Sequence, residues 1–230
     1  MNGARRVLVV APHADDETLG AGATIARLAA EGHEVTVAVM TGHGDDGPHP
    51  LWPRSLWDTI RGEAREAMDI LGVKELLFRE VPAAMVANYP VHKLNKEAVG
   101  VIEQVRPDML FVPFLWDLHK DHREMFHAFS VAWRTTSAAG KGIREIYAYE
   151  TLSETHWNAP YIEPGFVPNV HVDVSDFLEK KIEALARYKS QIQPAPATRS
   201  LEAVRAQAVW RGAQVGVRAA EAFVMVRQLV

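Results

Sequence analysis

The residues best suited to chemistry form two short clusters, each placed directly after an apolar run. Residues 13–16 read His-Ala-Asp-Asp, and residues 119–122 read His-Lys-Asp-His. Burying adjacent charges costs several kcal/mol per ion unless something compensates them. Imidazole and carboxylate groups without sulfur suit zinc or another first-row divalent ion. The chain has no Cys, which excludes a thiolate metal site and a cysteine nucleophile.

The first cluster has the residue types of a catalytic metal site. Such a site takes three protein ligands and keeps one position for water, whose pKa falls to about 7. Asp15 and Asp16 are adjacent and cannot easily point the same way from an extended chain. We therefore expect one to hold the metal and the other to take the proton of the water. The simpler alternative is a helix start rich in acids, which the helix dipole favours. It explains Asp16 and Glu17 but not His13.

The second cluster places two histidines three residues apart. If Asp121 begins a helix, His119 and His122 can both face the sheet edge, one as a metal ligand and the other free. A free histidine there can stabilise an oxyanion or protonate a leaving amine. Asp117 or Asp121 could hold its tautomer. Taken alone, the pair could also be two exposed loop histidines.

The elements around these clusters predict an α/β fold, a Rossmann-like and mostly parallel sheet flanked by helices. Residues 6–11 and 109–114 are apolar at nearly every position, as in parallel strands buried on both faces, and residues 34–41 read as a second, β-branched strand. A helical pattern over 19–30 links the first two strands into a βαβ unit. Ligands of such sheets bind outside the carboxyl ends of the strands, so the two clusters are expected to meet in space.

The rest of the chain adds further elements without a domain boundary, so we expect one domain over residues 1–230. A small C-terminal strand element and terminal helices complete the predicted fold. Helices are expected at 59–71, 91–105, 121–137, 175–190 (with Ser175 as its N-cap) and 201–217. A strand is expected at 75–79, and a smaller antiparallel element at 144–150 and 169–174.

A long loop over residues 42–58 is expected to be functional or mobile. Its start matches Gly-x-Gly-x-x-Gly, but two acids and Pro48 argue against a phosphate site. We assign His43 and His49 to its polar surface.

Composition narrows the class of partner. The 230 residues carry a net charge of -4 and no basic run, which argues against nucleic acid. No apolar stretch reaches the roughly 18 residues of a membrane span. No signal peptide is apparent at residues 1–6, and a cytoplasmic location is expected.

The two clusters resemble the motifs of the PIG-L / LmbE-like family of zinc-dependent N-acetylglucosaminyl deacetylases. The family usually has His-Pro-Asp-Asp-Glu, where Ala14 replaces the Pro here, and His-Pro-Asp-His, where Lys120 replaces it. Similar residues also recur at 61–63, 172–175, 190–191, 211–212 and 220–223. The resemblance therefore covers nearly the whole chain.

The resemblance implies a role for each matching residue. The implied zinc ligands are His13, Asp16 and His122. Asp15 matches the general base. His119 matches the histidine that stabilises the oxyanion or acts as acid, with Asp121 as its partner. Arg61 falls where the family has an arginine that can contact the substrate.

The implied reaction removes the N-acetyl group of an amino sugar and releases acetate. Bacterial members act on thiol-cofactor precursors, chitooligosaccharides or antibiotic intermediates, so the expected partner is a small amino-sugar substrate. A homo-oligomer is expected, with a hexamer as the specific form. Two other functions stay open. The first is a metallophosphoesterase, a class that favours two ions about 4 Å apart and therefore more ligands than the three found here. The second is a nucleotide-binding or regulatory module without a metal.

Overall fold

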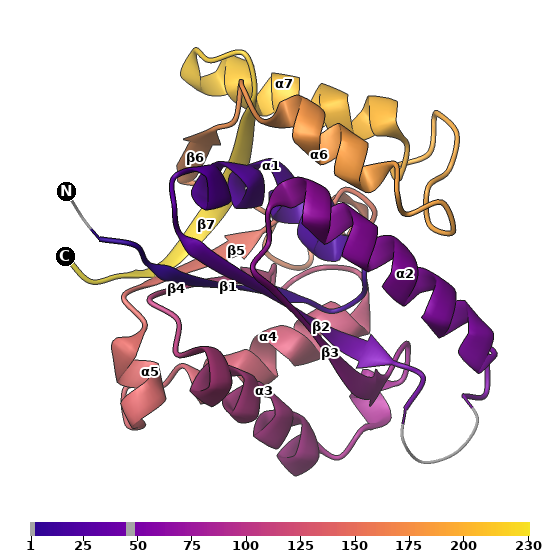
Figure 1. Ribbon diagram of the computed structural model, residues 1–230, viewed down its shortest axis with the longest axis vertical. Helices are drawn as coiled ribbons and strands as arrows, with labels where there is room; N and C mark the ends of the chain where they lie inside the picture. The colour runs from indigo at the N-terminus through magenta and orange to yellow at the C-terminus, as the bar shows by residue number, and fades with distance from the viewer. Residues whose placement is uncertain (1–2, 45–48) are drawn as a thin grey trace.

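The computed structural model describes residues 3–44 and 49–230. Within them, strands form one seven-stranded sheet in the order β3-β2-β1-β4-β5-β7-β6 (Figure 1). The strands are β1 (Arg6–Ala11), β2 (Glu34–Gly42), β3 (Glu75–Pro82), β4 (Met109–Pro113), β5 (Glu145–Tyr149), β6 (Val170–Asp173) and β7 (Ala220–Gln228). The predicted α/β, mostly parallel sheet is therefore confirmed.

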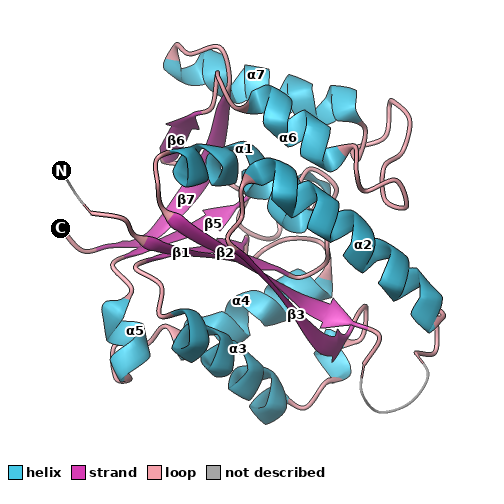
Figure 2. Cartoon of the chain, viewed as in Figure 1, coloured by secondary structure: helices cyan, strands magenta, loops and turns pink. Residues whose placement is uncertain are grey.

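Helices cover both faces of this sheet (Figure 2). One layer holds α1 (Asp16–Ala30), α2 (Arg54–Leu71), α6 (Leu178–Leu185) and α7 (Leu201–Val215). The other holds α3 (Val91–Val105), α4 (Lys120–Ala132) and α5 (Ala138–Gly142), with the 3₁₀ turn η1 (Val86–Asn88); a second turn, η2 (Thr155–Trp157), follows β5. No helix in the described ranges is both long and apolar enough to cross a membrane.

Strand β1 shows why the sequence is apolar at every position. Val7 and Val9 pack into the core under α1 and α2, whereas Leu8 and Val10 pack into the core over α3 and α4. All four are fully buried. Because both faces of the central strands are covered, alternation with polar residues is lost.

The carboxyl ends of β1 and β4 form the point where the site can assemble. These strands are adjacent and parallel, with Val7 opposite Met109 and Val9 opposite Phe111. On its other side β1 pairs in parallel with β2. The chain thus leaves β1 and β4 at the same edge of the sheet. From there α1 runs over one face and α4 over the other, as at the ligand-binding edge of other open α/β sheets.

The far end of the sheet differs from the prediction. Strand β5, expected in a smaller antiparallel element, pairs in parallel with β4. The antiparallel part consists of β7 against β5 and β6 against β7. Strand β7 was missed because its buried Glu221 interrupts the apolar pattern. That carboxylate accepts the backbone N–H groups of Ala23 and Thr24 in α1, at 3.1 and 2.6 Å.

Several predicted helix ends also moved, among them the end of α6, which lies at Leu185 and not at residue 190. Helix α6 begins at Leu178, because Ser175 donates both its N–H and its hydroxyl to Asp173 and makes a turn instead of a cap. Helix α2 begins at Arg54, since Pro53 suits the position before a helix. Helix α4 stops at Ala132.

Helix α1, which presents the acidic cluster at its start, is held close to β5. An added Cβ on Gly20 would lie 2.2 Å from Cδ2 of Tyr149, so only glycine permits this approach. The Tyr149 hydroxyl donates to the Val10 carbonyl at 2.8 Å. Lys181 donates to the Leu19 carbonyl at 2.8 Å and pairs with Glu221. The helix start is therefore placed by buried packing and buried charge together.

Candidate metal and catalytic site

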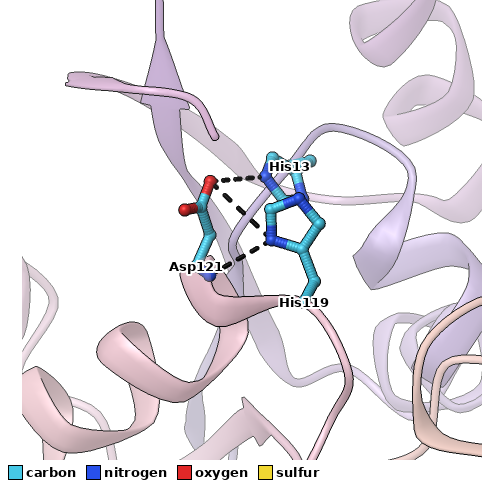
Figure 3. Close-up of side chains that lie close together, drawn as sticks. All are labelled: His13, His119 and Asp121. Carbon is cyan, nitrogen blue, oxygen red and sulfur yellow. Dashed lines mark hydrogen bonds and ion pairs between the residues drawn. The ribbon is translucent and has the colours of Figure 1, made fainter. Parts of the chain in front are cut away.

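The two predicted clusters meet at the edge formed by β1 and β4. The ring centroid of His13 lies 4.7 Å from that of His119 and 5.5 Å from that of His122. Figure 3 shows His13 and His119 converging on Asp121. Residues from two distant segments of the chain thus share one site, as the sheet topology predicted.

Two groups of side chains here could hold a metal ion. In each group the ligand atoms lie within 4.8 Å of one another: His13 with Asp16 and His122, and His13 with His119 and Asp121. In the second group, the Asp121 carboxylate is already used. It accepts the N–H groups of Ala84 and Val86 at 2.6 and 3.2 Å, and lies 2.9 Å from His13 Nε2.

The first group has free ligand atoms. Asp16 Oδ1 and His122 Nε2 are both buried, and neither has a hydrogen-bond partner among the described residues. His122 Nε2 lies 3.2 Å from Asp16 Oδ2 without hydrogen-bond geometry. Buried polar atoms are almost always satisfied, so such a pair calls for an ion or water between them. The residues therefore fit a divalent ion at His13, Asp16 and His122.

Neighbouring groups orient these side chains. Asp117 Oδ2 lies 2.8 Å from Nδ1 of His122, which directs the opposite nitrogen toward Asp16. The backbone N–H of His13 donates to Asp16 Oδ2 at 2.8 Å. Carboxylate partners of this kind fix the ring orientation of histidine ligands. Asp117 was one of two candidates for holding the tautomer of the histidine that binds no metal; its carboxylate contacts His122, the proposed ligand.

Charge at the site is balanced by protonated histidines. Burial would lower the pKa of His13, but its hydrogen bonds to Asp121 and Asp16 raise the pKa to about 9. Burial also opposes charge on His122, yet the Asp16 charge and the Asp117 hydrogen bond raise its pKa well above the usual value. The pKa of Asp16 is lowered against its burial, chiefly by the charge of His122. A divalent cation would balance the same carboxylate with both imidazoles neutral.

Asp15 sits beside this group in a strained backbone conformation. Its φ angle is 126°, in the region that favours glycine, and its side chain is buried. Burial, and next the charge of Asp16, raise the pKa of Asp15 to about 8. Strained residues of this kind cluster at functional sites.

His119 caps the start of α4 with its ring. Nδ1 accepts the backbone N–H of Asp121 at 3.1 Å, so the ring proton of neutral His119 lies on Nε2. Burial and the nearby His13 charge lower the pKa of His119 to about 4. Asp121 Oδ2 lies 2.9 Å from His13 Nε2 and 4.0 Å from His119 Nδ1, and the hydrogen bond to His119 comes from the backbone N–H of Asp121. The role of Asp121 as partner of His119 stays a prediction.

A cavity of about 400 Å³ opens beside these residues. Its wall includes Trp52, Leu56, Trp57, Ile60, Ser190, Gln191 and Arg199 together with His13, Asp15 and His119. Trp52 stacks on His49, with centroids 5.1 Å apart and an interplanar angle of 24°. His43 and His49 are buried, contrary to the expected surface position, because His43 accepts the His49 N–H and His49 bonds to the Ala83 carbonyl. Residues 45–48 of the predicted Gly-x-Gly-x-x-Gly loop lie outside the described residues.

Two arginines lie near the site. Arg61 pairs with Glu80 and lies over the Phe78 ring, outside the residues that line the cavity, so its substrate role stays a prediction. Arg199, which sequence reasoning missed, lines the cavity 3.8 Å from Asp15 Oδ2 and 3.7 Å from Glu154. Its only sequence signal is its place between a proline-rich turn and the start of α7.

Glu17, in the first turn of α1, is fully buried. It accepts the hydroxyl groups of Tyr188 and Thr18 at 2.6 Å each, and the backbone N–H of Asp15 at 3.2 Å. Burial raises the pKa of Glu17. This side chain therefore supports the turn that carries Asp15.

Residues 8–133 match the family model described as PIG-L, GlcNAc-PI de-N-acetylase, and the chain belongs to this family. The chain is 28% identical over 197 residues to a diacetylchitobiose deacetylase of Thermococcus kodakarensis, covering 83% of this chain and 71% of that protein.

Two solved structures share the fold. A conserved protein of Thermus thermophilus has a TM-score of 0.75 at 27% identity, covering 98% of this chain and 96% of that one. The N,N'-diacetylchitobiose deacetylase of Pyrococcus horikoshii has a TM-score of 0.75 at 25% identity, covering 97% and 84%. The predicted family is confirmed.

Proposed function

We propose that this protein is a metal-dependent deacetylase that hydrolyses the N-acetyl group of an N-acetylglucosamine-containing compound and releases acetate. The observation that carries the proposal is a pair of buried ligand atoms, Asp16 Oδ1 and His122 Nε2, that have no hydrogen-bond partner in the part of the chain that the structure describes and lie beside the strained Asp15. Family membership and the named relatives support the reaction class. We choose zinc as the metal, with His13, Asp16 and His122 as ligands, because their donors are nitrogen and oxygen only.

When bound, such an ion polarises the amide carbonyl and lowers the pKa of a water molecule. Asp15 then accepts the proton of the attacking water. Without metal, the pKa of Asp15 is about 8. A nearby cation lowers the pKa of a carboxyl group, so metal binding brings the pKa of Asp15 into the range of a base that works near neutral pH. Arg199, 3.8 Å from the Asp15 carboxylate, acts in the same direction.

His119 stabilises the developing oxyanion. With Nδ1 occupied by a backbone N–H, Nε2 carries the proton and can donate it as a hydrogen bond to the carbonyl oxygen. Its pKa of about 4 keeps the ring neutral near pH 7, so the proton for the leaving amine comes from Asp15. Asp121 has a positioning role, since its carboxylate holds His13 and its N–H holds His119.

The cavity favours an uncharged sugar next to the N-acetyl group. Trp52 is 37% exposed, and aromatic faces stack on sugar rings. Among the lining residues that the structure describes, Arg199 is the one permanent cation, and it already faces Asp15 and Glu154. An anionic substituent would therefore find no unpaired positive charge there. A chitooligosaccharide such as diacetylchitobiose satisfies both conditions.

An acetate-release assay on N-acetylglucosamine and diacetylchitobiose, with and without chelator, tests the proposal. Activity should disappear with chelator and return with zinc. Asp15→Asn should abolish turnover and retain about one metal ion per chain, whereas Asp16→Asn should lose the metal. Metal-free protein with full activity, or normal turnover by both variants, would show that the site is misassigned.

The phosphoesterase alternative is disfavoured by the ligand count. The two candidate metal groups among the described residues share His13, so they do not provide two separate ions with full ligand sets. A regulatory module without metal gives no reason for the unpartnered Asp16 and His122 atoms. Cytoplasmic location and a homo-oligomer, specifically a hexamer, belong to the proposal, and mass measurement in solution tests the latter.

A further inference from the structure

We propose that Thr155 is a positioning residue for the metal site, acting through Asp117 to present Nε2 of His122 to the ion. This inference rests on the metal site proposed above. Thr155 lies in η2, on the segment that follows β5, and touches none of the three proposed ligands directly through the hydrogen bonds described here.

A continuous chain of short hydrogen bonds links Thr155 to the site. The Thr155 hydroxyl lies 2.6 Å from Asp117 Oδ1. The other oxygen of this carboxylate lies 2.8 Å from His122 Nδ1. At the far end, the backbone N–H of Thr151 donates to Thr155 Oγ1 at 2.8 Å. Both oxygens of Asp117 are thus engaged, one by the hydroxyl and one by the ring.

The donor and acceptor of every hydrogen bond in this series follow from its first donor, the backbone N–H of Thr151. A backbone N–H can only donate, so Thr155 Oγ1 accepts from Thr151 and its own proton is free to point at Asp117. An ionised carboxylate can only accept, so it receives the Thr155 hydroxyl and the Nδ1–H of His122. A protonated imidazole must lose one proton to bind a metal ion. Because Asp117 holds the proton on Nδ1, the proton that His122 loses is the one on Nε2, and the lone pair for the metal is then on Nε2. That is the buried nitrogen without a partner, facing Asp16.

Burial makes the Thr155 hydroxyl hard to replace. Thr151, Asp117 and His122 are each 0% exposed, and Thr155 is 5% exposed. Water therefore has little access to the free oxygen that would remain on Asp117 after loss of the hydroxyl. The segment is also anchored at its start, because Glu150 forms a buried two-bond ion pair with Arg211 at 2.7 and 2.6 Å.

Zinc affinity of the full chain tests this role. Thr155→Val keeps the shape and removes the donor. Loss of the direct partner of a histidine ligand typically weakens metal binding about 10- to 100-fold. Thr155 acts one bond further out, so we expect the lower end, about tenfold, for zinc in competition with a chromophoric chelator. Thr155→Ser restores the hydroxyl and should restore the affinity. Thr24→Val is the matched control, since Thr24 is similarly buried and its hydroxyl has no partner among the described residues.

The protection of the His122 Nδ1 proton against solvent exchange, measured by NMR on protein with ¹⁵N-labelled histidine, gives a second readout. We expect Thr155→Val to speed this exchange and Thr24→Val to leave it unchanged. If the valine variant does not fold, Thr155→Ala is measured with the same expectations.

The two proposals fail in different ways. Wild-type zinc affinity and wild-type exchange protection in the hydroxyl-free variant would overturn the role of Thr155 while leaving the metal site in place. Absence of zinc binding by the wild-type protein would refute the metal site itself. The exchange measurement on the same samples would still report whether Thr155 holds Asp117 and His122.

Discussion

Removing the Asp15 carboxyl group should stabilise the metal-free protein while abolishing activity. The group is buried, and its pKa rises from the ordinary 3.8 to about 8. At pH 7 the unfolded chain is ionised at this position and the folded chain is protonated, so the folded state is penalised. About three pH units separate pH 7 from the ordinary pKa, and each is worth about 1.4 kcal/mol. Asp15→Asn should therefore raise the free energy of unfolding by about 4 kcal/mol.

The sign of the pH dependence is part of this prediction. Because the pKa of the folded state is the higher one, the penalty is absent well below about pH 4 and grows as the pH rises toward about 8. The gain of Asp15→Asn should shrink to about 2 kcal/mol at about pH 5. Urea unfolding of chelator-treated wild-type and variant protein at both pH values measures it.

The backbone adds a second term at the same position. A non-glycine residue in this region of positive φ costs about 1–3 kcal/mol. In ordinary backbone, replacing alanine by glycine lowers stability by about 0.5–1 kcal/mol. Here Asp15→Gly should be at least as stable as Asp15→Ala. The electrostatic reasoning would be refuted if Asp15→Asn were no more stable than wild type, or if its increase in the free energy of unfolding did not depend on pH. The strain would be refuted if Asp15→Gly were less stable than Asp15→Ala by the usual penalty of about 0.5–1 kcal/mol.

Three further predictions concern the metal, the substrate and the fold. Both histidine ligands and Asp15 are protonated near pH 7 without metal, and each must lose a proton for the zinc-bound enzyme to work. Zinc uptake should therefore release about three protons and weaken as the pH falls. Calorimetry in buffers of different ionisation enthalpy counts them, and zero release contradicts the ligand set. Trp52→Ala should raise KM for diacetylchitobiose about tenfold with little change in kcat, whereas Trp157→Ala, outside the cavity wall, should change neither. Gly20→Ala should lower the free energy of unfolding by about 1–3 kcal/mol through its clash with Tyr149. Gly62 lies in helix α2 with open space around it, so Gly62→Ala should raise the free energy of unfolding by about 0.5–1 kcal/mol in the same urea experiment.

Conflict between stability and function explains several features of the site. Asp15 combines strain with a buried carboxyl group, and Asp16 and His122 leave ligand atoms unpaired. Each feature destabilises the metal-free fold, and each becomes useful once an ion and a substrate are present. Natural proteins commonly accept such costs at the residues that do chemistry.

Local sequence determined the central sheet and the residue types of the site. Residues that are apolar at every position can only be buried on both faces, so β1 and β4 were predictable as parallel central strands. The polar clusters follow those strands directly, and topology alone requires adjacent parallel strands to end at one edge. The meeting of residues 13–16 with 119–122 was therefore foreseeable.

Partners that come from distant segments were decided only by the tertiary structure. Arg199 reaches the cavity from the turn before α7, and nothing in its neighbours in sequence marks it. The ion pair of Arg61 with Glu80 on strand β3 is likewise a contact between distant segments. The Asp121 carboxylate lies closer to His13 than to His119, because side-chain contacts depend on side-chain direction and not on spacing along the chain.

The same distinction holds for the far end of the sheet and for the proposed ligand His122. Strand β7 is hidden in the sequence because its buried Glu221 serves the backbone of α1, a contact between opposite ends of the chain. The sequence by itself identified His122 as a candidate ligand, since its type and position suit a metal. Which of its nitrogens is directed toward Asp16 depends on Asp117 and Thr155, which only folding brings to the same buried place.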